Sequence, residues 1–257
     1  MITDSHAHLY WKDFDADRAE VLARARAAGV TRMVIVGTDL ASSAAAFALC
    51  ADEAGLFPTA GIHPHDAKDA GPAERAAIEA LCRRPECVGV GETGLDFFKN
   101  FSPRAEQLDA FLWHLDLAQR LDRPVVIHCR DAHADTVRCL AQFPRVRGVM
   151  HCYTMGPEEL PPYLEHGLHI SFSGVVTYPK NHANRAAAAL VPAERLLVET
   201  DCPYLAPEGF RGKRNEPARV VRVLEELARV RGASVPDLAR ATSACATELF
   251  ALPAAMA

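Results

Sequence analysis

The chain has 257 residues, of which 49% are hydrophobic and 24% charged, and its net charge is −5. These proportions are typical of a globular protein with a full hydrophobic core, so they exclude a disordered chain. The negative charge excludes a protein that coats nucleic acid through an overall positive surface. A nucleic-acid substrate would therefore have to be held locally.

Short apolar runs alternate along the chain with longer amphipathic segments. Several runs are continuously apolar, such as 33–36 and 125–127, which is typical of strands buried on both faces of a parallel sheet. The predicted strands lie near residues 1–5, 31–37, 57–62, 87–92, 124–128, 147–151, 168–172 and 195–199.

The segments between these runs predict helices. Over 103–120 the apolar residues recur at the spacing of one helix face, and Ser102 followed by Pro103 predicts an N-cap and a first turn. Ser234 with Asp237 resembles a capping box before the last helix.

Repeated units of a strand and a helix, roughly 30 residues each, predict a (β/α)₈ TIM barrel in the α/β class, formed as one domain over residues 1–257. A doubly wound open sheet is the alternative. It is less well supported because no glycine-rich phosphate loop follows the first strand.

The first predicted strand ends in the string DSHAH, which places His6 and His8 two residues apart. Alternate side chains of a strand point the same way, so both imidazoles can face one metal. Two surface histidines near the N-terminus would give the same string. The motif alone does not decide between the two interpretations.

Other predicted strands also end in residues that bind metals. TIM-barrel active sites lie at the C-terminal ends of the strands, so these side chains would converge in one mouth. Any one of them, such as His128, would by itself be interpreted as a core histidine bonded to a backbone carbonyl. Their joint pattern instead predicts a metal site, and the further ligands are Glu92, His128, His151 and Asp201.

The sequence strings around these residues resemble the TatD family of metal-dependent deoxyribonucleases, within the amidohydrolase superfamily. The resemblance covers nearly the whole chain and rests on ITDSHAHL, AGIHPH, VGVGETGLDFF, PVVIHCRDA, GVMHCYT, LLVETDCPYLAP and RGKRNEP. In many other amidohydrolases a carboxylated lysine bridges the metals. Glu92 at that position favours the TatD branch.

The resemblance implies a role for each ligand. His6 and His8 would hold one metal together with Asp201. His128 and His151 would hold a second metal. Glu92 would bridge the two, which makes Glu92 and Asp201 the expected catalytic carboxylates.

Three further residues near the predicted ligands have expected roles outside metal binding. By resemblance His63 contacts a substrate phosphate, whereas the alternative is a hydrogen bond that orients a ligand. His65 is expected to face solvent. Tyr10 stands where family members often have Asp or Asn, which puts a contact at the edge of the pocket in doubt and leaves metal binding intact.

The loop at 210–215 follows the last predicted strand and would lie on the catalytic face. Arg211, Lys213 and Arg214 are expected to contact phosphates. A solvated charged loop is the alternative, because acidic residues flank it. Aromatic residues on the same face would stack on bases or cover the barrel rim, and they are Phe97, Phe98, Phe101, Tyr204 and Phe210.

The expected chemistry is phosphodiester hydrolysis of a nucleic acid, DNA being favoured, by an exonuclease-type enzyme with two divalent cations per chain. The mixed nitrogen and oxygen ligands suit Mg²⁺, Mn²⁺ or Zn²⁺. An ester or amide hydrolase on the same barrel, such as an aminoacyl-tRNA deacylase, is the alternative. A non-catalytic nucleic-acid-binding scaffold would show a missing ligand, and no ligand is missing.

The sequence predicts a cytoplasmic monomer that does not contact a membrane. No apolar run reaches the roughly 18 residues of a membrane span, and no signal-peptide pattern is present. The eight cysteines form no CxxC pair and are expected to be free thiols. Cys129, Cys152 and Cys202 each follow a proposed ligand, and strand alternation should turn them away from the metals.

Overall fold

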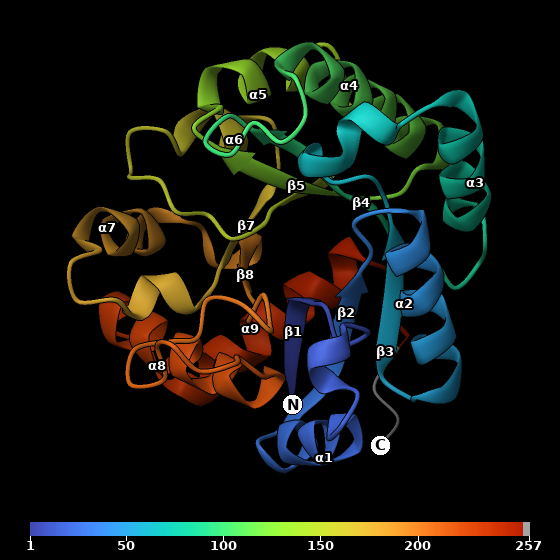
Figure 1. The fold of residues 1–257 in the computed structure, drawn as a ribbon. Coiled ribbons are helices and arrows are strands. Elements are labelled where there is room, and N and C mark those ends of the chain that lie inside the picture. The colour runs from blue at the N-terminus through green and yellow to red at the C-terminus, as the bar shows by residue number, and fades with distance from the viewer. Residues whose placement is uncertain (254–257) are drawn as a thin grey trace.

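The computed structural model describes residues 1–253. An eight-stranded parallel sheet with the order β1 to β8 surrounds the centre of the molecule, and the helices form an outer ring (Figure 1). This architecture confirms the predicted (β/α)₈ barrel. The strands are β1 Ile2–Ala7, β2 Val30–Val36, β3 Leu56–Ala60, β4 Gly89–Asp96, β5 Val125–Arg130, β6 Gly148–Met150, β7 His169–Phe172 and β8 Leu196–Val198.

The helices follow the strands in the expected alternation. They are α1 Arg18–Ala27, α2 Leu40–Asp52, α3 Pro72–Cys82, α4 Arg104–Leu121, α5 His133–Leu140, α6 Pro161–Glu165, α7 His182–Leu190, α8 Val220–Arg231 and α9 Val235–Leu249. Short 3₁₀ turns lie at Lys12–Phe14, Pro64–Asp69, Gly174–Thr177, Ala193–Arg195 and Pro217–Arg219. Within residues 1–253, no helix has both the length and the apolar character needed to cross a membrane.

The barrel closes where β1 meets the segment after β8. The amide of Asp201 donates to the carbonyl of His6 at 2.9 Å, and the amide of His8 donates to the carbonyl of Cys202 at 2.9 Å. These bonds hold the ends of the first and last strands side by side. The C-terminal ends of all the strands therefore face one mouth.

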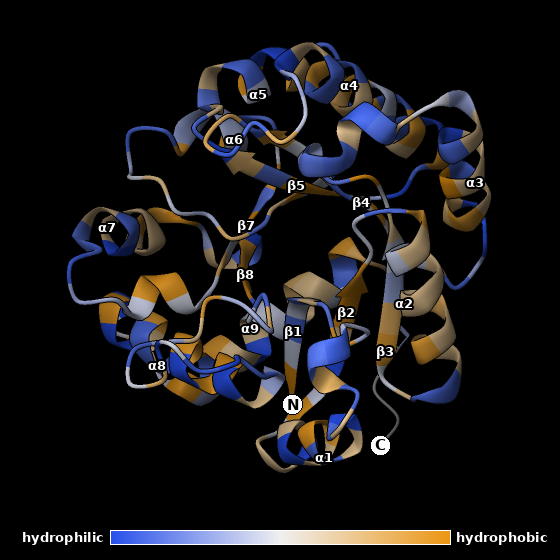
Figure 2. Cartoon of the chain, in the orientation of Figure 1, coloured by the Kyte–Doolittle hydropathy of each residue, from blue (hydrophilic) through white to orange (hydrophobic). Residues whose placement is uncertain are grey.

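Apolar side chains fill the barrel below this mouth. Figure 2 shows hydrophobic residues along β2 and β3, as expected for strands buried on both faces. One buried cluster joins strand residues to α9 and the residues after it, and it contains Val34, Val36, Val88, Val126, Val149, Leu197, Cys245, Ala246, Leu249, Phe250 and Leu252. Helix α9 also contacts the starts of strands, since Ser243 Oγ accepts the amide of Thr3 at 3.0 Å. It covers the end of the barrel opposite the mouth.

Two predicted helix caps have different outcomes. Ser234 caps α9 as predicted, because its hydroxyl accepts the amide of Asp237 at 3.2 Å. The prediction for Ser102 was wrong, because Pro103 occupies the N-cap position of α4. The Ser102 hydroxyl donates instead to the carbonyl of His65 at 2.7 Å, so it fixes a loop at the mouth.

Candidate metal centre

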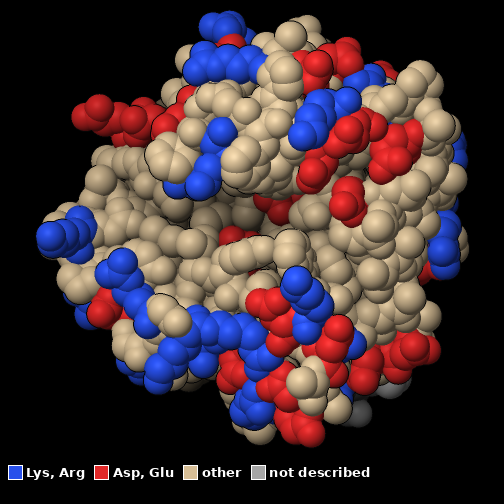
Figure 3. Space-filling view, in the orientation of Figure 1, with Lys and Arg blue, Asp and Glu red and all other residues tan. Residues whose placement is uncertain are grey.

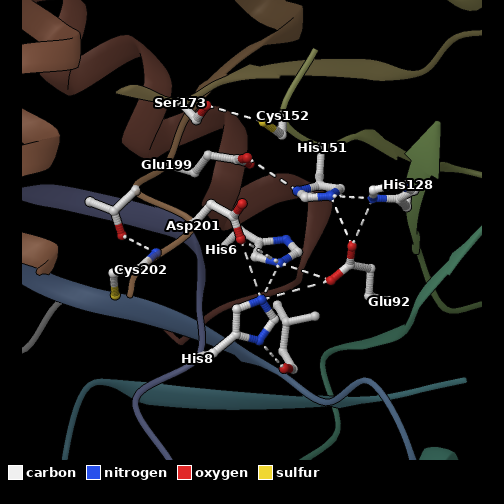
Figure 4. A network of polar contacts seen from close by, with 12 residues as sticks. His6, His8, Glu92, His128, His151, Cys152, Ser173, Glu199, Asp201 and Cys202 are labelled. Carbon is white, nitrogen blue, oxygen red and sulfur yellow. Dashed lines mark hydrogen bonds and ion pairs between the residues drawn. The ribbon is translucent and has the colours of Figure 1, made fainter. Parts of the chain in front are cut away.

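The proposed ligands lie together at the barrel mouth (Figure 4). His6 is on β1, Glu92 on β4 and His128 on β5. His8 and His151 directly follow β1 and β6, and Asp201 is the third residue after β8. All are buried or nearly so, and the side chain of Asp201 is 13% exposed. Figure 3 shows a hollow in this face with acidic side chains at its floor and Lys and Arg side chains on its rim.

His6, His8, Asp201 and one oxygen of Glu92 form the first group of donor atoms. The Nε2 atoms of His6 and His8 are 3.1 Å apart. Glu92 Oε2 is 3.2 Å from His6 Nε2 and 3.8 Å from His8 Nε2. Asp201 Oδ1 is 3.7 and 3.4 Å from the same two nitrogens. Donors about 2.1 Å from a tetrahedral ion are about 3.4 Å apart, so this spacing fits a single cation.

The second oxygen of Glu92 faces a separate pair of imidazoles. Glu92 Oε1 is 3.2 Å from His128 Nδ1 and 3.0 Å from His151 Nε2. These two nitrogens are 3.4 Å apart. Each oxygen of one carboxylate thus meets its own set of imidazoles, which is the geometry of a bridging ligand.

The outer ring nitrogens of three histidines are held by acceptors. His8 Nδ1 is 2.8 Å from the carbonyl of Val36. His128 Nε2 is 3.2 Å from Asp96 Oδ2, and His151 Nδ1 is 3.2 Å from Glu199 Oε1. A nitrogen facing such an acceptor carries the hydrogen in a neutral ring, so the other nitrogen presents a lone pair to the centre. The fit to a cation is good, because in these neutral tautomers the ring lone pairs and the carboxylate oxygens face the same central space.

The pKa values describe a carboxylate strongly favoured in its charged form. Burial raises the pKa of Glu92, but the imidazoles of His151 and His63 outweigh it and hold the pKa well below its usual range. Burial lowers the pKa of His151, but Glu92 and Glu199 raise it well above its usual value. Glu92 therefore stays ionised and offers two negatively charged oxygens to the surrounding groups.

A close approach of two glycines precedes Glu92. A Cβ added to Gly61 would lie 2.4 Å from the Cα of Gly91, so a side chain at position 61 would collide with the backbone. Gly91 also has a φ of 124°, a conformation that L side chains rarely adopt. The strings AGIHPH and VGVGETG are thus tied to the backbone path that delivers Glu92 to the centre.

His63 lies in the pocket but differs from the ligands in its hydrogen bonding. Its Nε2 is 3.3 Å from Glu92 Oε1, close enough to count as a donor for the second cation. Its Nδ1, however, accepts the amide of His65 at 3.1 Å. Burial lowers the pKa of His63 to about 4, so the ring is neutral and Nε2 carries its hydrogen. That tautomer makes Nε2 a hydrogen-bond donor and a poor metal ligand.

His65 lies elsewhere than predicted, and Asp96 is a site residue that was not predicted. His65 does not simply face solvent, because its Nε2 is 2.9 Å from Asp96 Oδ2. The same Asp96 oxygen orients His128. The sequence feature that could have indicated Asp96 was its position in the VGVGETGLDFF string, which places it at the end of β4.

Glu199 is a second missed residue. It is fully buried behind His151, and its Oε2 has no hydrogen-bond partner among residues 1–253. Its signal was a carboxylate two positions before Asp201, on the same strand end. It positions the ring of His151.

The cysteines that follow ligands turn away from the pocket, as predicted. Cys152 Sγ is 3.1 Å from Ser173 Oγ, and Cys129 Sγ accepts the hydroxyl of Thr136 at 3.3 Å. Tyr10 sits behind a ligand, since its hydroxyl is 3.1 Å from His8 Nδ1 and donates to the carbonyl of Val36 at 3.0 Å.

The three cationic side chains of the loop after β8 lie in two different environments. Arg211 stacks on Tyr178 at 4.4 Å from the ring centre and, like Lys213, is exposed. Arg214 is bound to both carboxylate oxygens of Asp17, at 2.8 and 2.7 Å. This ion pair holds Arg214 against α1, so the predicted phosphate contact of Arg214, which stays a prediction, would have to compete with Asp17.

The sequence matches the family model described as TatD related DNase over residues 3–251. The chain is 42% identical over 244 residues to a protein of Cronobacter turicensis named 3'-5' ssDNA/RNA exonuclease TatD, covering 92% of this chain and 93% of that one. It is 36% identical over 252 residues to a Bacillus subtilis protein named uncharacterized metal-dependent hydrolase YabD, covering 97% and 99%.

The fold also matches a solved structure. The crystal structure of YJJV, a TatD homolog from Escherichia coli K12, superposes with a TM-score of 0.92 over 98% of each chain, at 30% identity. The arrangement of strands and helices is therefore shared along the whole described chain.

Proposed function

The chain belongs to the TatD-related DNase family and is a metal-dependent hydrolase, and from that premise we propose that it is an exonuclease acting on single-stranded nucleic acid. One observation carries the proposal. The two oxygens of Glu92 face separate groups of imidazoles, and both groups open onto a mouth with exposed cations on its rim. Such a mouth suits an anionic phosphodiester.

We assign two divalent cations to the centre. His6, His8 and Asp201 would hold one, His128 and His151 the other, and Glu92 both. When bound, the cations would supply positive charge for the phosphate oxygens and lower the pKa of a water molecule. Mg²⁺, Mn²⁺ and Zn²⁺ all accept these donors.

The chain's own groups orient the reactants. Burial raises the pKa of Asp201, but the hydrogen bond with His8 outweighs it and keeps the pKa low, so Asp201 is ionised and can accept a proton from the attacking water. His63 can donate its Nε2 hydrogen to a phosphate oxygen. Glu92 stays ionised and fixes the spacing between the two groups.

Arg211 and Lys213 would hold the strand outside the centre. The net charge of −5 disfavours nonspecific binding, so attraction has to come from local cations. Both residues are exposed on the loop after β8 and make no strong ion pair within residues 1–253, the nearest carboxylate oxygen to Arg211 being that of Glu208 at 3.9 Å.

The function is tested with end-labelled DNA and RNA, single- and double-stranded, with the products resolved by length. We expect mononucleotides released from one end of single strands, no activity after chelation, and recovery with added Mg²⁺ or Mn²⁺. Full activity in a chelated sample free of metal would refute the mechanism. Cleavage of aminoacyl esters without cleavage of any oligonucleotide would instead establish the ester hydrolase.

The role of the loop is tested by salt dependence. The double variant Arg211→Ala/Lys213→Ala should bind single strands more weakly. Its slope of log K against log salt should flatten by roughly one to two units, since each of the two lost phosphate contacts contributes about 0.7. Arg145→Ala/Arg147→Ala removes two cations that precede β6, at the opposite end of the barrel, and is the matched control. Equal slopes for both variants would show that the loop is only solvated surface.

A further inference from the structure

The exposed aromatic side chains gather at the barrel mouth. Phe98 is 54% exposed, Phe101 is 57% exposed, and both follow the end of β4. Exposed aromatic rings have an unfavourable free energy in water, so two of them on one short loop mark a contact surface.

This loop is rigid where it leaves β4. Asp96 Oδ1 accepts the amides of Phe98 and Lys99 at 3.0 and 2.8 Å. The side-chain amide of Asn100 donates to the carbonyl of Phe97 at 2.7 Å. The rings are thus presented on a fixed backbone, which lowers the entropy cost of stacking a ligand on them.

Two cations accompany the rings. The guanidinium of Arg130 lies 3.8 Å from the ring centre of Phe98, and Lys99 Nζ is 5.7 Å from Phe98 and 5.9 Å from Phe101. Lys99 and Arg130 are exposed and contact these rings, and among residues 1–253 neither forms an ion pair; the exposed Asp131 directly follows Arg130. Both charges are available to an anion.

The surface is continuous with the metal centre. Arg130 is two residues beyond His128 on β5 and therefore projects from the same face of the strand. The ring centres of Phe101 and His65 are 4.8 Å apart, and those of His65 and His63 are 4.3 Å apart. A strand whose phosphate lies in the pocket would pass directly over these rings.

We infer that Phe98, Lys99, Phe101 and Arg130, here called the aromatic shelf, bind the unpaired bases next to the phosphate that is cut. The rings stack on bases, and the cations contact the adjoining phosphates. Paired bases have no free face for the rings, so the shelf selects single strands. This inference rests on the proposed function, because it assigns a substrate contact at the same site.

The test compares binding of two single strands of equal length, one of thymidines and one of abasic residues, both with phosphorothioate linkages that slow cleavage. Binding to the metal-loaded enzyme is measured by fluorescence anisotropy. The wild type should bind the thymidine strand more tightly. In Phe98→Ala/Phe101→Ala the Kd for thymidines should rise roughly 10- to 100-fold, and the Kd for the abasic strand should change less than about threefold.

Two further variants separate stacking from loss of structure. Phe98→Trp/Phe101→Trp keeps flat rings and should restore thymidine binding. Leu190→Ala removes a side chain that is 62% exposed on α7 and should leave both Kd values unchanged. The aromatic shelf would be refuted if the wild type bound the two strands with equal affinity. It would also be refuted if the alanine variant lost the same factor in Kd for both strands.

The outcomes also separate the shelf from the activity. If the enzyme cleaves strands but binds them without a preference for bases, the exonuclease proposal is supported and the aromatic shelf is refuted. If the enzyme binds strands with a preference for bases but cleaves none, the aromatic shelf is supported and the exonuclease proposal is refuted.

Discussion

The two ends of the barrel are filled by opposite kinds of side chain, although the same strands supply both. Toward α9 the interior is dry and apolar, with Val126 and Leu197 packed near Phe250. At the mouth, two to four residues further along the chain, the interior holds imidazoles and carboxylates at 3.0 to 3.8 Å from one another. One end stabilises the barrel, and the other holds charged groups that would repel or pair without a ligand.

Because the two ends hold different kinds of side chain, we predict that a substitution at the mouth affects activity and a substitution at the apolar end affects stability. The largest effect should come from Glu92→Gln, which offers one poorer oxygen donor in place of two. We expect turnover to fall on the order of a thousandfold with loss of bound metal. The circular dichroism spectrum should be unchanged, because the apolar core lies below. Near-normal rate with both metals retained would show that Glu92 does not bridge.

A substitution at the apolar end should lower the stability of the protein and leave its activity unchanged. Phe250 is 1% exposed and packs against the start of β4. Phe250→Ala should lower the free energy of unfolding by about 3–5 kcal/mol, measured by urea titration, because it leaves a cavity. At temperatures where the variant is folded, kcat should equal that of the wild type. A drop in kcat of more than about threefold would break the separation of the two ends.

Glu199 lies on the boundary between the ends. It orients His151, so Glu199→Gln should weaken metal binding by about 10- to 100-fold in a calorimetric titration. Glu194→Gln, an exposed glutamate before β8, is the control and should bind metal normally. If both variants bind metal alike, Glu199 is a packing residue only.

His114 links the helix layer to the mouth and should respond to pH. Its Nε2 accepts the amide of Ile62 at 3.0 Å, and burial lowers its pKa to about 3. The unfolded chain, with a pKa near 6.5, therefore binds the proton first, and stability is lost as pH falls below about 6.5. Between pH 7 and pH 5 this group should account for about 2 kcal/mol of lost stability.

The measurement is the unfolding free energy of the wild type and His114→Gln across that range. The variant should have a shallower pH dependence by this amount. His182→Gln, at an exposed position, should follow the wild type. Parallel curves for His114→Gln and the wild type would mean that His114 is already protonated in the fold.

Tyr10 should show the smallest effect at the mouth. Its hydroxyl contacts His8 Nδ1, but the carbonyl of Val36 already binds that nitrogen at 2.8 Å. Tyr10→Phe should therefore change kcat/KM by about threefold or less, with metal content unchanged. Loss of metal in elemental analysis would show that the hydroxyl is needed to hold His8.

The sequence predicted the strands and their ends well, because continuous apolar runs and strand-end polar residues are local signals. Every predicted strand overlaps an observed one, and the proposed ligands converge as the barrel rule requires. The partners behind the ligands were not predictable. Asp96 reaches His128 because Gly94 pairs with His128 across β4 and β5, and this register is a property of the assembled barrel.

The loops gave the weakest predictions for a related reason. Arg214 and Arg211 are close in sequence and alike in charge, yet an ion pair with Asp17 distinguishes them. Asp17 lies 197 residues earlier in the chain. Ser102 similarly serves a distant loop instead of its own helix. No local pattern can rank such partners, because they meet only after folding.

The meeting of β1 with the segment after β8 has a consequence for synthesis of the chain. His6 and His8 are synthesised with β1, whereas Asp201 follows β8 and is synthesised after nearly all of the barrel. An unfinished chain therefore carries histidines but lacks the carboxylate that completes the first group of donors. We expect a hydrolase built this way to be inactive until its last strand is in place, so that nascent chains and early-terminated fragments do not cleave substrate.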